Sequence, residues 1–184
     1  MIKQSENLDS IFRRSPEYEL PLSERMRTFL RLEFLYQQFN YFVEIETDWA
    51  SRTAVTSLLD MMAILTRGDI RSDVHKELDR HIGILTSYHS QPTVDPERLD
   101  VMVENLTKRR DALRAIGTNF IQPLRDNEFL SAIKHRNTIP GGTCEFDLPE
   151  FSHWLRQIPS RRKQDFDLWL SMIKPVCNAV IELL

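Results

Sequence analysis

From Met26 to Phe42, large apolar residues recur every three or four positions. This spacing places side chains on one face of an α-helix, whereas a half-buried strand needs alternation at every second residue. Ser23 stands just before the stretch, where its side chain can accept a hydrogen bond from a free backbone amide of the first turn. The stretch therefore predicts a long amphipathic helix with one face buried. Its apolar positions are Met26, Phe29, Leu32, Leu35, Phe39 and Phe42, with Leu30, Phe34 and Val43 widening the buried face.

The same spacing returns along the rest of the chain, and residues typical of helix ends separate the segments. Acidic and hydroxyl side chains cap helix starts, and proline fits the first turn because no hydrogen bond needs its missing amide there. Pro175 falls inside the last segment, where its ring should kink the helix. Helix starts are expected near Asp48 or Ser51, at Asp69, at Asp95-Pro96, near residue 125, at Pro149 and at Ser160.

Two short segments alternate apolar and polar residues, which is the pattern of a strand. One is 18–20, and the other is 143–146, directly after Ile139-Pro140-Gly141-Gly142, a sequence that fits a type II turn. We therefore expect a mainly α fold, a helical bundle with a minor β element. Residues 1–16 are polar and end at a proline, so we expect a flexible N-terminal arm followed by a helical domain over 17–184.

Composition and charge narrow the functional classes. The chain has 184 residues, of which 41% are hydrophobic and 28% charged, as in an ordinary globular protein with one sizeable core. Its formal net charge of −3 argues against a protein that wraps nucleic acid, because phosphate neutralisation normally needs a basic chain. No run approaches the ~18 apolar residues of a membrane span, and the N-terminus lacks the apolar core of a secretory signal. We therefore expect a protein that binds neither nucleic acid nor membranes. Its two cysteines are too few for a disulfide framework and are typical of reduced thiols in a cytosolic protein.

Few residues could carry covalent or metal chemistry. Cys144 follows the Gly-Gly turn and could act as a nucleophile with His135 or His153 as its base. Its position beside Phe146 in the expected strand favours a buried structural thiol instead. The histidines lack metal-binding spacings, and the Gly-Gly pair is too short to cradle a phosphate. We expect no enzyme activity, no catalytic residue, no metal and no cofactor. A cysteine-dependent enzyme remains an alternative function, ranked after the two binding functions described below.

Basic clusters are the stronger candidates for a binding site. Arg27 and Arg31 are one helical turn apart, and like charges at this spacing repel by roughly a few tenths of a kcal/mol. An acidic partner is therefore expected there, and that partner could be Glu24 within the chain. The runs 108–110 and 161–163 are most simply solvated helix faces. They also support the alternative function, a nucleic-acid-binding helical regulator.

Four blocks of sequence carry a family resemblance. They are Pro21–Phe34, Arg67-Gly68-Asp69-Ile70-Arg71, Lys76-Glu77-Leu78-Asp79-Arg80, and Ile139–Pro149 followed by Trp154-Leu155. In order and spacing, over most of residues 18–184, they resemble the ZapD (Z-ring-associated protein D) family of bacterial cell division proteins.

The resemblance implies a cytoplasmic, non-enzymatic homodimer with a helical domain and a β-strand domain. It also implies that a basic surface binds the acidic, disordered C-terminal tail of the tubulin-like protein FtsZ and that the dimer crosslinks FtsZ filaments at midcell. By position, the resemblance assigns tail binding to Arg27, Arg31 and Arg67. Charge and nearness to the four blocks add Arg71, Lys134 and Arg136.

The chain departs from the family pattern at both ends. It has extra residues at the N-terminus and lacks the strand-rich C-terminal segment, so we expect only 18–20 and 143–146 to remain of a truncated β domain. It also stops on the apolar turn Val180–Leu184, and we infer that the natural chain continues beyond residue 184. If the missing segment completes the basic surface, the fragment is expected to bind FtsZ poorly.

Overall fold

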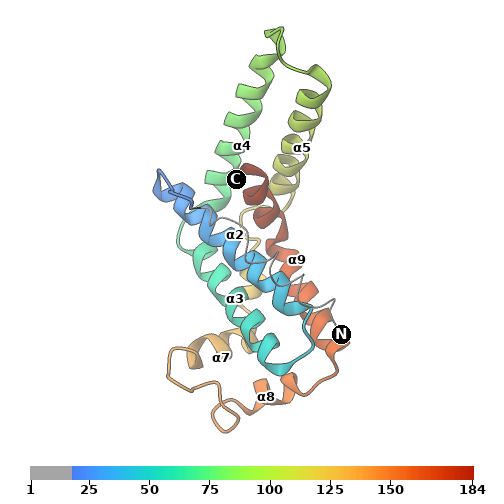
Figure 1. Cartoon of the computed structure of the whole chain (residues 1–184). Helices are drawn as coiled ribbons and strands as arrows, with labels where there is room; N and C mark the ends of the chain where they lie inside the picture. The colour runs from blue at the N-terminus through green and yellow to red at the C-terminus, as the bar shows by residue number, and fades with distance from the viewer. Residues whose placement is uncertain (1–17) are drawn as a thin grey trace, which may run out of the picture.

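The computed structural model describes residues 18–184, and most of them are helical (Figure 1). This architecture confirms the expected mainly α fold. In chain order the described elements are α2 (Glu24–Val43), α3 (Asp48–Thr66), α4 (Ile70–Ser87), the 3-10 helix η1 (Tyr88–Ser90), α5 (Pro96–Ala115), α6 (Gln122–Arg125), α7 (Glu128–Arg136), α8 (Pro149–Leu155) and α9 (Pro159–Leu183).

Helices α2, α4 and α5 begin at side-chain caps, whereas α9 begins at Pro159 after Ile158 without one, so the start expected at Ser160 is wrong. Ser23 accepts a hydrogen bond from the Met26 amide at 3.2 Å, which confirms the cap expected for the first amphipathic stretch. Asp69 and Asp95 cap α4 and α5 in the same way, as their positions in the sequence predicted. Each cap accepts a hydrogen bond from an amide that would otherwise lack an acceptor in the first turn, so the helix boundaries follow local sequence.

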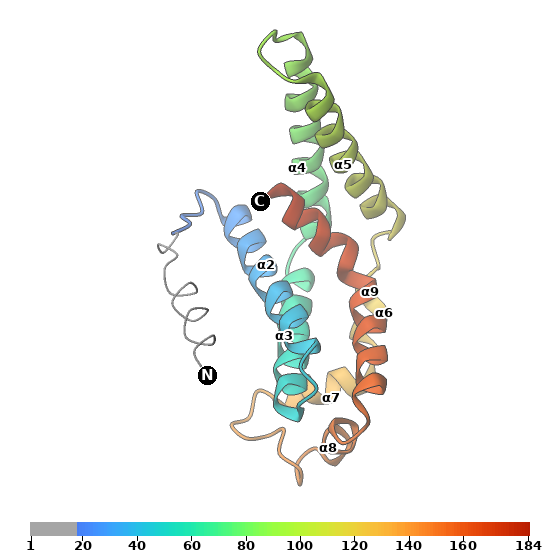
Figure 2. The ribbon, with the colours of Figure 1, turned by 45° about the vertical axis from the view of Figure 1, so that its right-hand side comes forward.

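The helices form an elongated body with a projecting hairpin. Helices α2 and α3 pack antiparallel, and α9 packs against α2, α4 and α5 (Figures 1 and 2). Helices α4 and α5 form a hairpin that extends away from one end of the body, and α7 and α8 lie at the opposite end. Helix α9 therefore joins the base of the hairpin to the rest of the core.

One apolar core runs through the body. Phe29 and Leu32 of α2, Leu58 of α3, and Phe166 and Ile173 of α9 are almost completely buried in it. Burying each such side chain contributes about 1.5–3 kcal/mol, so this packing and not local helix propensity supplies most of the stability. Near α8 the core becomes aromatic, and its rings, separated by 5.3–6.1 Å, belong to Phe129, Phe151, Trp154, Phe166 and Trp169.

Helix α9 runs through Pro175 without ending there. Figure 2 shows the helix changing direction along its C-terminal part, as expected where a proline ring removes one backbone hydrogen bond. Its C-terminal part approaches α4 and α5, so the bend brings the last turns of the chain to the base of the hairpin.

The expected strands at 18–20 and 143–146 are wrong, because within residues 18–184 the structure contains no strand. Residues 143–146 form consecutive turns, and the Cys144 amide donates to the Gly141 carbonyl at 2.9 Å. A strand needs a neighbouring strand for its backbone groups, and alternation of side chains cannot supply one. The arm expected over 1–16 lies outside the described residues.

The turn that precedes this segment is confirmed. The Gly142 amide donates to the Ile139 carbonyl at 2.9 Å, and Gly141 has a φ of 74°, a left-handed conformation that glycine adopts without a Cβ clash. At Gly142 a Cβ would collide with the carbonyl oxygen of Arg136. Both glycines are therefore required by the path of the chain.

Candidate functional site

A surface groove between α2 and α3 brings together three of the six predicted binding residues, Arg27, Arg31 and Arg67. Its volume is about 490 Å³, which is within the range of ligand-binding pockets in proteins. From the N-terminal segment and α2 it is lined by Pro21, Arg27, Leu30, Arg31, Phe34 and Leu35, and from α3 and its C-cap by Asp60, Ala63, Ile64 and Arg67.

The antiparallel packing of α2 and α3 creates this arrangement. Arg27 and Arg31 are four residues apart, so they project from the same face of α2. Arg67 lies at the end of α3, which runs back beside the start of α2 (Figure 1). Residues 40 positions apart along the chain therefore share one end of the groove.

The floor of the groove is apolar. Leu30, Leu35 and Ile64 are half-buried there, and Phe34 is 63% exposed at its edge. The sequence pattern placed Phe34 on the buried face of its helix, and that prediction is wrong. Helix periodicity identifies a face of α2, but only the positions of the neighbouring helices decide how much of that face is covered.

The three groove arginines differ in their contacts. Arg27 forms an ion pair with Glu24, the partner considered from the sequence, with Nε and Oε1 3.4 Å apart. Both side chains are strongly exposed, so this pair contributes little to stability. The guanidinium groups of Arg31 and Arg67 form no hydrogen bond or ion pair with any other described residue. Two positive charges are therefore available to a ligand without breaking a hydrogen bond or ion pair among residues 18–184.

Asp60 is the acidic residue that lines the groove. Partial burial raises the pKa of its carboxyl above the ordinary value, because removing water disfavours the charged form. Sequence reasoning missed both Asp60 and Ile64. Their spacing from Arg67, seven and three residues, places all three on one face of a helix and could have indicated them.

The other three predicted residues do not reach the groove. The Arg71 side chain donates to the carbonyl oxygens of Leu113 at 3.1 Å and Arg114 at 3.4 Å, at the end of α5. Arg136 lies 3.7 Å from a carboxylate oxygen of Asp147, and Lys134 lines a separate small pocket beside α7. The structure thus divides the predicted set into one cluster of three and three separate residues.

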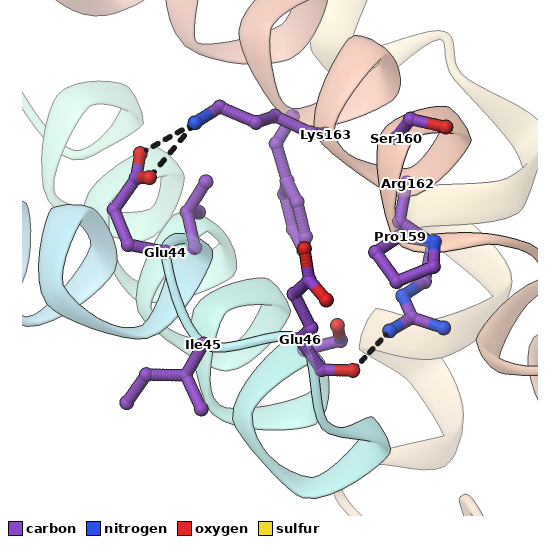
Figure 3. Close-up of a pocket in the computed structure, with 10 residues that line it drawn as sticks. Glu44, Ile45, Glu46, Pro159, Ser160, Arg162 and Lys163 are labelled. Carbon is purple, nitrogen blue, oxygen red and sulfur yellow. Dashed lines mark hydrogen bonds and ion pairs between the residues drawn. The ribbon is translucent and has the colours of Figure 1, made fainter.

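In the basic run 161–163, Arg162 and Lys163 are occupied by structural contacts (Figure 3), whereas Arg161 is exposed. Arg162 is only 4% exposed, and it donates to the carbonyl oxygens of Leu155, of Gln157 at 2.7 Å and of Glu46 at 2.8 Å. Lys163 Nζ lies 2.8 Å from both carboxylate oxygens of Glu44. These residues therefore connect the start of α9 to the α2–α3 turn and do not present a basic surface.

The run 108–110 is paired in the same manner. Lys108 lies 2.7 Å from a carboxylate oxygen of Glu104, and Arg109 lies 3.2 Å from one of Glu182. Arg110 lies 3.4 Å from Asp79. Neither run resembles a cationic surface for nucleic acid, because each would have to exchange internal carboxylates for phosphates.

The two thiols are placed differently. Cys177 is buried in α9, and burial raises its pKa to about 12. The half-buried Cys144 has Asp147 Oδ2 as a hydrogen-bond partner, 3.7 Å from its Sγ. Within residues 18–184 no three potential His, Cys, Asp or Glu ligands converge to hold a metal ion. Among the described helices, none combines the length and the hydropathy needed to cross a membrane.

The fold and the groove define an α-helical protein whose distinctive surface feature is an arginine-lined groove with an apolar floor. Comparison with known proteins then identifies the family. The family model of ZapD, described as a cell division protein, matches residues 30–184. The chain therefore belongs to the ZapD family.

Individual relatives agree with this assignment. The chain is 38% identical over 164 residues to the cell division protein ZapD of Ralstonia nicotianae and 37% identical to that of Ralstonia pickettii. It is 36% identical over 163 residues to the ZapD protein of Janthinobacterium sp.. Each alignment includes 89% of this chain but 65% of the relative. The chain thus spans about two thirds of the length of the curated relatives that it matches.

Proposed function

We propose that this chain acts in cell division, in the cytoplasm at midcell, by binding the acidic C-terminal tail of FtsZ in the groove between α2 and α3. As a homodimer it would then crosslink FtsZ filaments and promote Z-ring assembly. The observation that carries the proposal is the convergence of Arg27, Arg31 and Arg67 over an apolar floor. Family membership supports the role in cell division.

The chemistry of the groove suits an acidic peptide. A guanidinium group presents a planar fork of N–H donors that matches a carboxylate in a bidentate pair, and such charge-assisted hydrogen bonds are stronger than neutral ones. The half-buried floor of Leu30, Leu35 and Ile64 can cover an apolar side chain between the carboxylates. The peptide's carboxylates would orient it in the groove, and the contact between its apolar side chain and the floor would remove water from both surfaces.

The energetics favour modest affinity at each site. A disordered tail loses conformational freedom when it binds, and this loss offsets much of the contact energy. We expect a dissociation constant on the order of micromolar for one tail. Two tails held by one dimer would bind with greater avidity, because the second encounter is intramolecular.

Charge reversal at Arg31 tests the site. A labelled FtsZ tail peptide would be titrated into the wild-type chain and into Arg31→Glu, with fluorescence anisotropy as the readout. Losing one attractive pair and gaining one repulsion at a partly exposed site should weaken binding by about tenfold. Raising the salt concentration should also weaken binding to the wild type, because the Debye length falls from about 10 Å at 0.1 M to about 3 Å at 1 M.

The matched control is Arg98→Glu, which makes the same change in net charge on the exposed surface of α5, outside the groove. It should leave the peptide affinity unchanged. If Arg31→Glu behaves like this control, Arg31 does not belong to the site. Salt-independent binding of the tail would refute the electrostatic mechanism, and light scattering that reports a monomer would refute crosslinking by a dimer.

A further inference from the structure

This inference rests on the proposed function and concerns which acidic peptides the groove selects. Three arginines and one aspartate line the same groove, yet no ion pair joins Asp60 to Arg27, Arg31 or Arg67. More broadly, Asp60 forms no hydrogen bond or ion pair with any other described residue. A carboxylate that lies in a cationic groove but remains unpaired must be held at a distance from the cations.

The register of the two helices explains this separation. Ser57 Oγ of α3 donates to Gln38 Oε1 of α2 at 3.0 Å, so these two residues lie level with one another. Because the helices are antiparallel, Asp60 lies level with the part of α2 near Leu35, and Arg67 lies level with the part near Arg27. Asp60 and Arg67 are seven positions apart, which at a rise of 1.5 Å per residue corresponds to about 10 Å along the groove.

The groove therefore has two chemically different ends. Arg27 and Arg67 form a cationic end, Arg31 lies between, and Asp60 with the exposed Phe34 forms an anionic and aromatic end. The half-buried floor, including Ile64, joins them. Asp60 is partly buried, and the loss of water around its carboxyl raises the pKa of that group. A cation brought by a ligand would therefore stabilise the charged carboxylate.

We propose that Asp60 gives the groove a direction: it receives a lysine or arginine of the bound peptide while the arginines at the other end receive the carboxylates. Asp60 is thus a specificity-determining residue for peptides that combine both charges. It also repels peptides whose acidic residues extend over the full length of the groove.

The separation of the two ends sets the spacing in the ligand. An extended chain advances about 3.3 Å per residue, so a 10 Å separation corresponds to about three residues. A helical ligand advances 1.5 Å per residue, and the same separation corresponds to about seven residues, or two turns. In both cases an apolar residue between the charges would lie over the floor of the groove.

The test uses designed peptides and the full chain. Each peptide carries an acidic pair, a leucine, and either lysine or glutamine placed three or seven positions after the acids. Wild-type protein should bind the lysine peptide about two- to fivefold more tightly than its glutamine counterpart at one of these spacings, the range expected for a partly exposed ion pair. Asp60→Asn should abolish this preference, and Asp60→Lys should transfer it to a peptide with glutamate at that position.

The matched control is Glu33→Gln, which removes one carboxylate from α2 outside the groove, where Glu33 accepts a hydrogen bond from Gln37 at 3.0 Å. This variant should retain the preference for lysine. Equal binding of the lysine and glutamine peptides by the wild type would overturn the inference, as would a lysine preference that survives in Asp60→Asn. If the FtsZ tail binds but none of the designed peptides does, the inference fails while the proposed function stands. If the FtsZ tail also fails to bind, both fail.

Discussion

Replacement of Arg162 by methionine should destabilise the fold far more than any change in the neighbouring basic residues. The Arg162 guanidinium group is buried and donates to three backbone carbonyls, those of Leu155, Gln157 and Glu46. It also lies 3.6 Å from a carboxylate oxygen of Asp48. Methionine fills part of the same volume but leaves all three carbonyls without this donor.

The magnitude follows from these contacts. A hydrogen bond to a charged group contributes about 1.5–3 kcal/mol, so three of them set an upper limit of roughly 4.5–9 kcal/mol. Asp48 is more than half exposed, so its pair with Arg162 adds less than about 1 kcal/mol. The pocket beside Arg162, with a volume of about 210 Å³, can admit water to the freed carbonyls and reduces the loss (Figure 3). We expect the free energy of unfolding to fall by about 3–5 kcal/mol, the lower part of the limit set by the three hydrogen bonds, because water can partly replace the lost donor.

Urea denaturation followed by circular dichroism at 222 nm would measure this change, and thermal unfolding should show a midpoint lower by about 10 °C. The control is Arg161→Met, because Arg161 is exposed and lies 3.9 Å from Asp165. That variant should change the free energy of unfolding by less than about 0.5 kcal/mol. A value for Arg162→Met within 1 kcal/mol of the wild type, at an unchanged denaturant slope, would refute the assignment of Arg162 as the connection between α9 and the α2–α3 turn.

Two further predictions concern titrating groups. The hydrogen bond from Arg80, together with Arg25, lowers the pKa of Glu77 below its ordinary value of 4.5, so its contribution is present above that pH and is lost as the pH falls through the lowered pKa. Glu77→Gln should therefore reduce the free energy of unfolding by up to about 1 kcal/mol at pH 7 and make it fall less steeply below pH 4.5. If the variant loses stability below pH 4.5 as steeply as the wild type, the prediction is wrong. Burial raises the pKa of Cys177 to about 12, so a thiol reagent at pH 8 should label only Cys144 in the folded chain and both thiols in urea. Rapid labelling of Cys177 in the folded chain would show that α9 opens.

Local rules predicted the helices well because the interactions that begin and end a helix lie within four residues. Ser23, Asp69 and Asp95 cap the helices that they were expected to begin. The left-handed Gly141 and the hydrogen bond across its turn also follow from a short sequence. The prediction of a strand at 143–146 is wrong because a strand, unlike a helix, depends on partners that are distant in sequence.

The sequence by itself determined the helical fold and placed Arg27 and Arg31 on one face of one helix. Only the tertiary structure decided which basic residues share a surface, because Arg67 reaches that face through the antiparallel turn of the chain between α2 and α3. It also buried Arg162, although its sequence neighbours are equally basic. Helical periodicity specifies the direction in which a side chain projects from the axis of its helix. Whether that direction meets water, a carbonyl or another helix depends on packing between residues far apart along the chain.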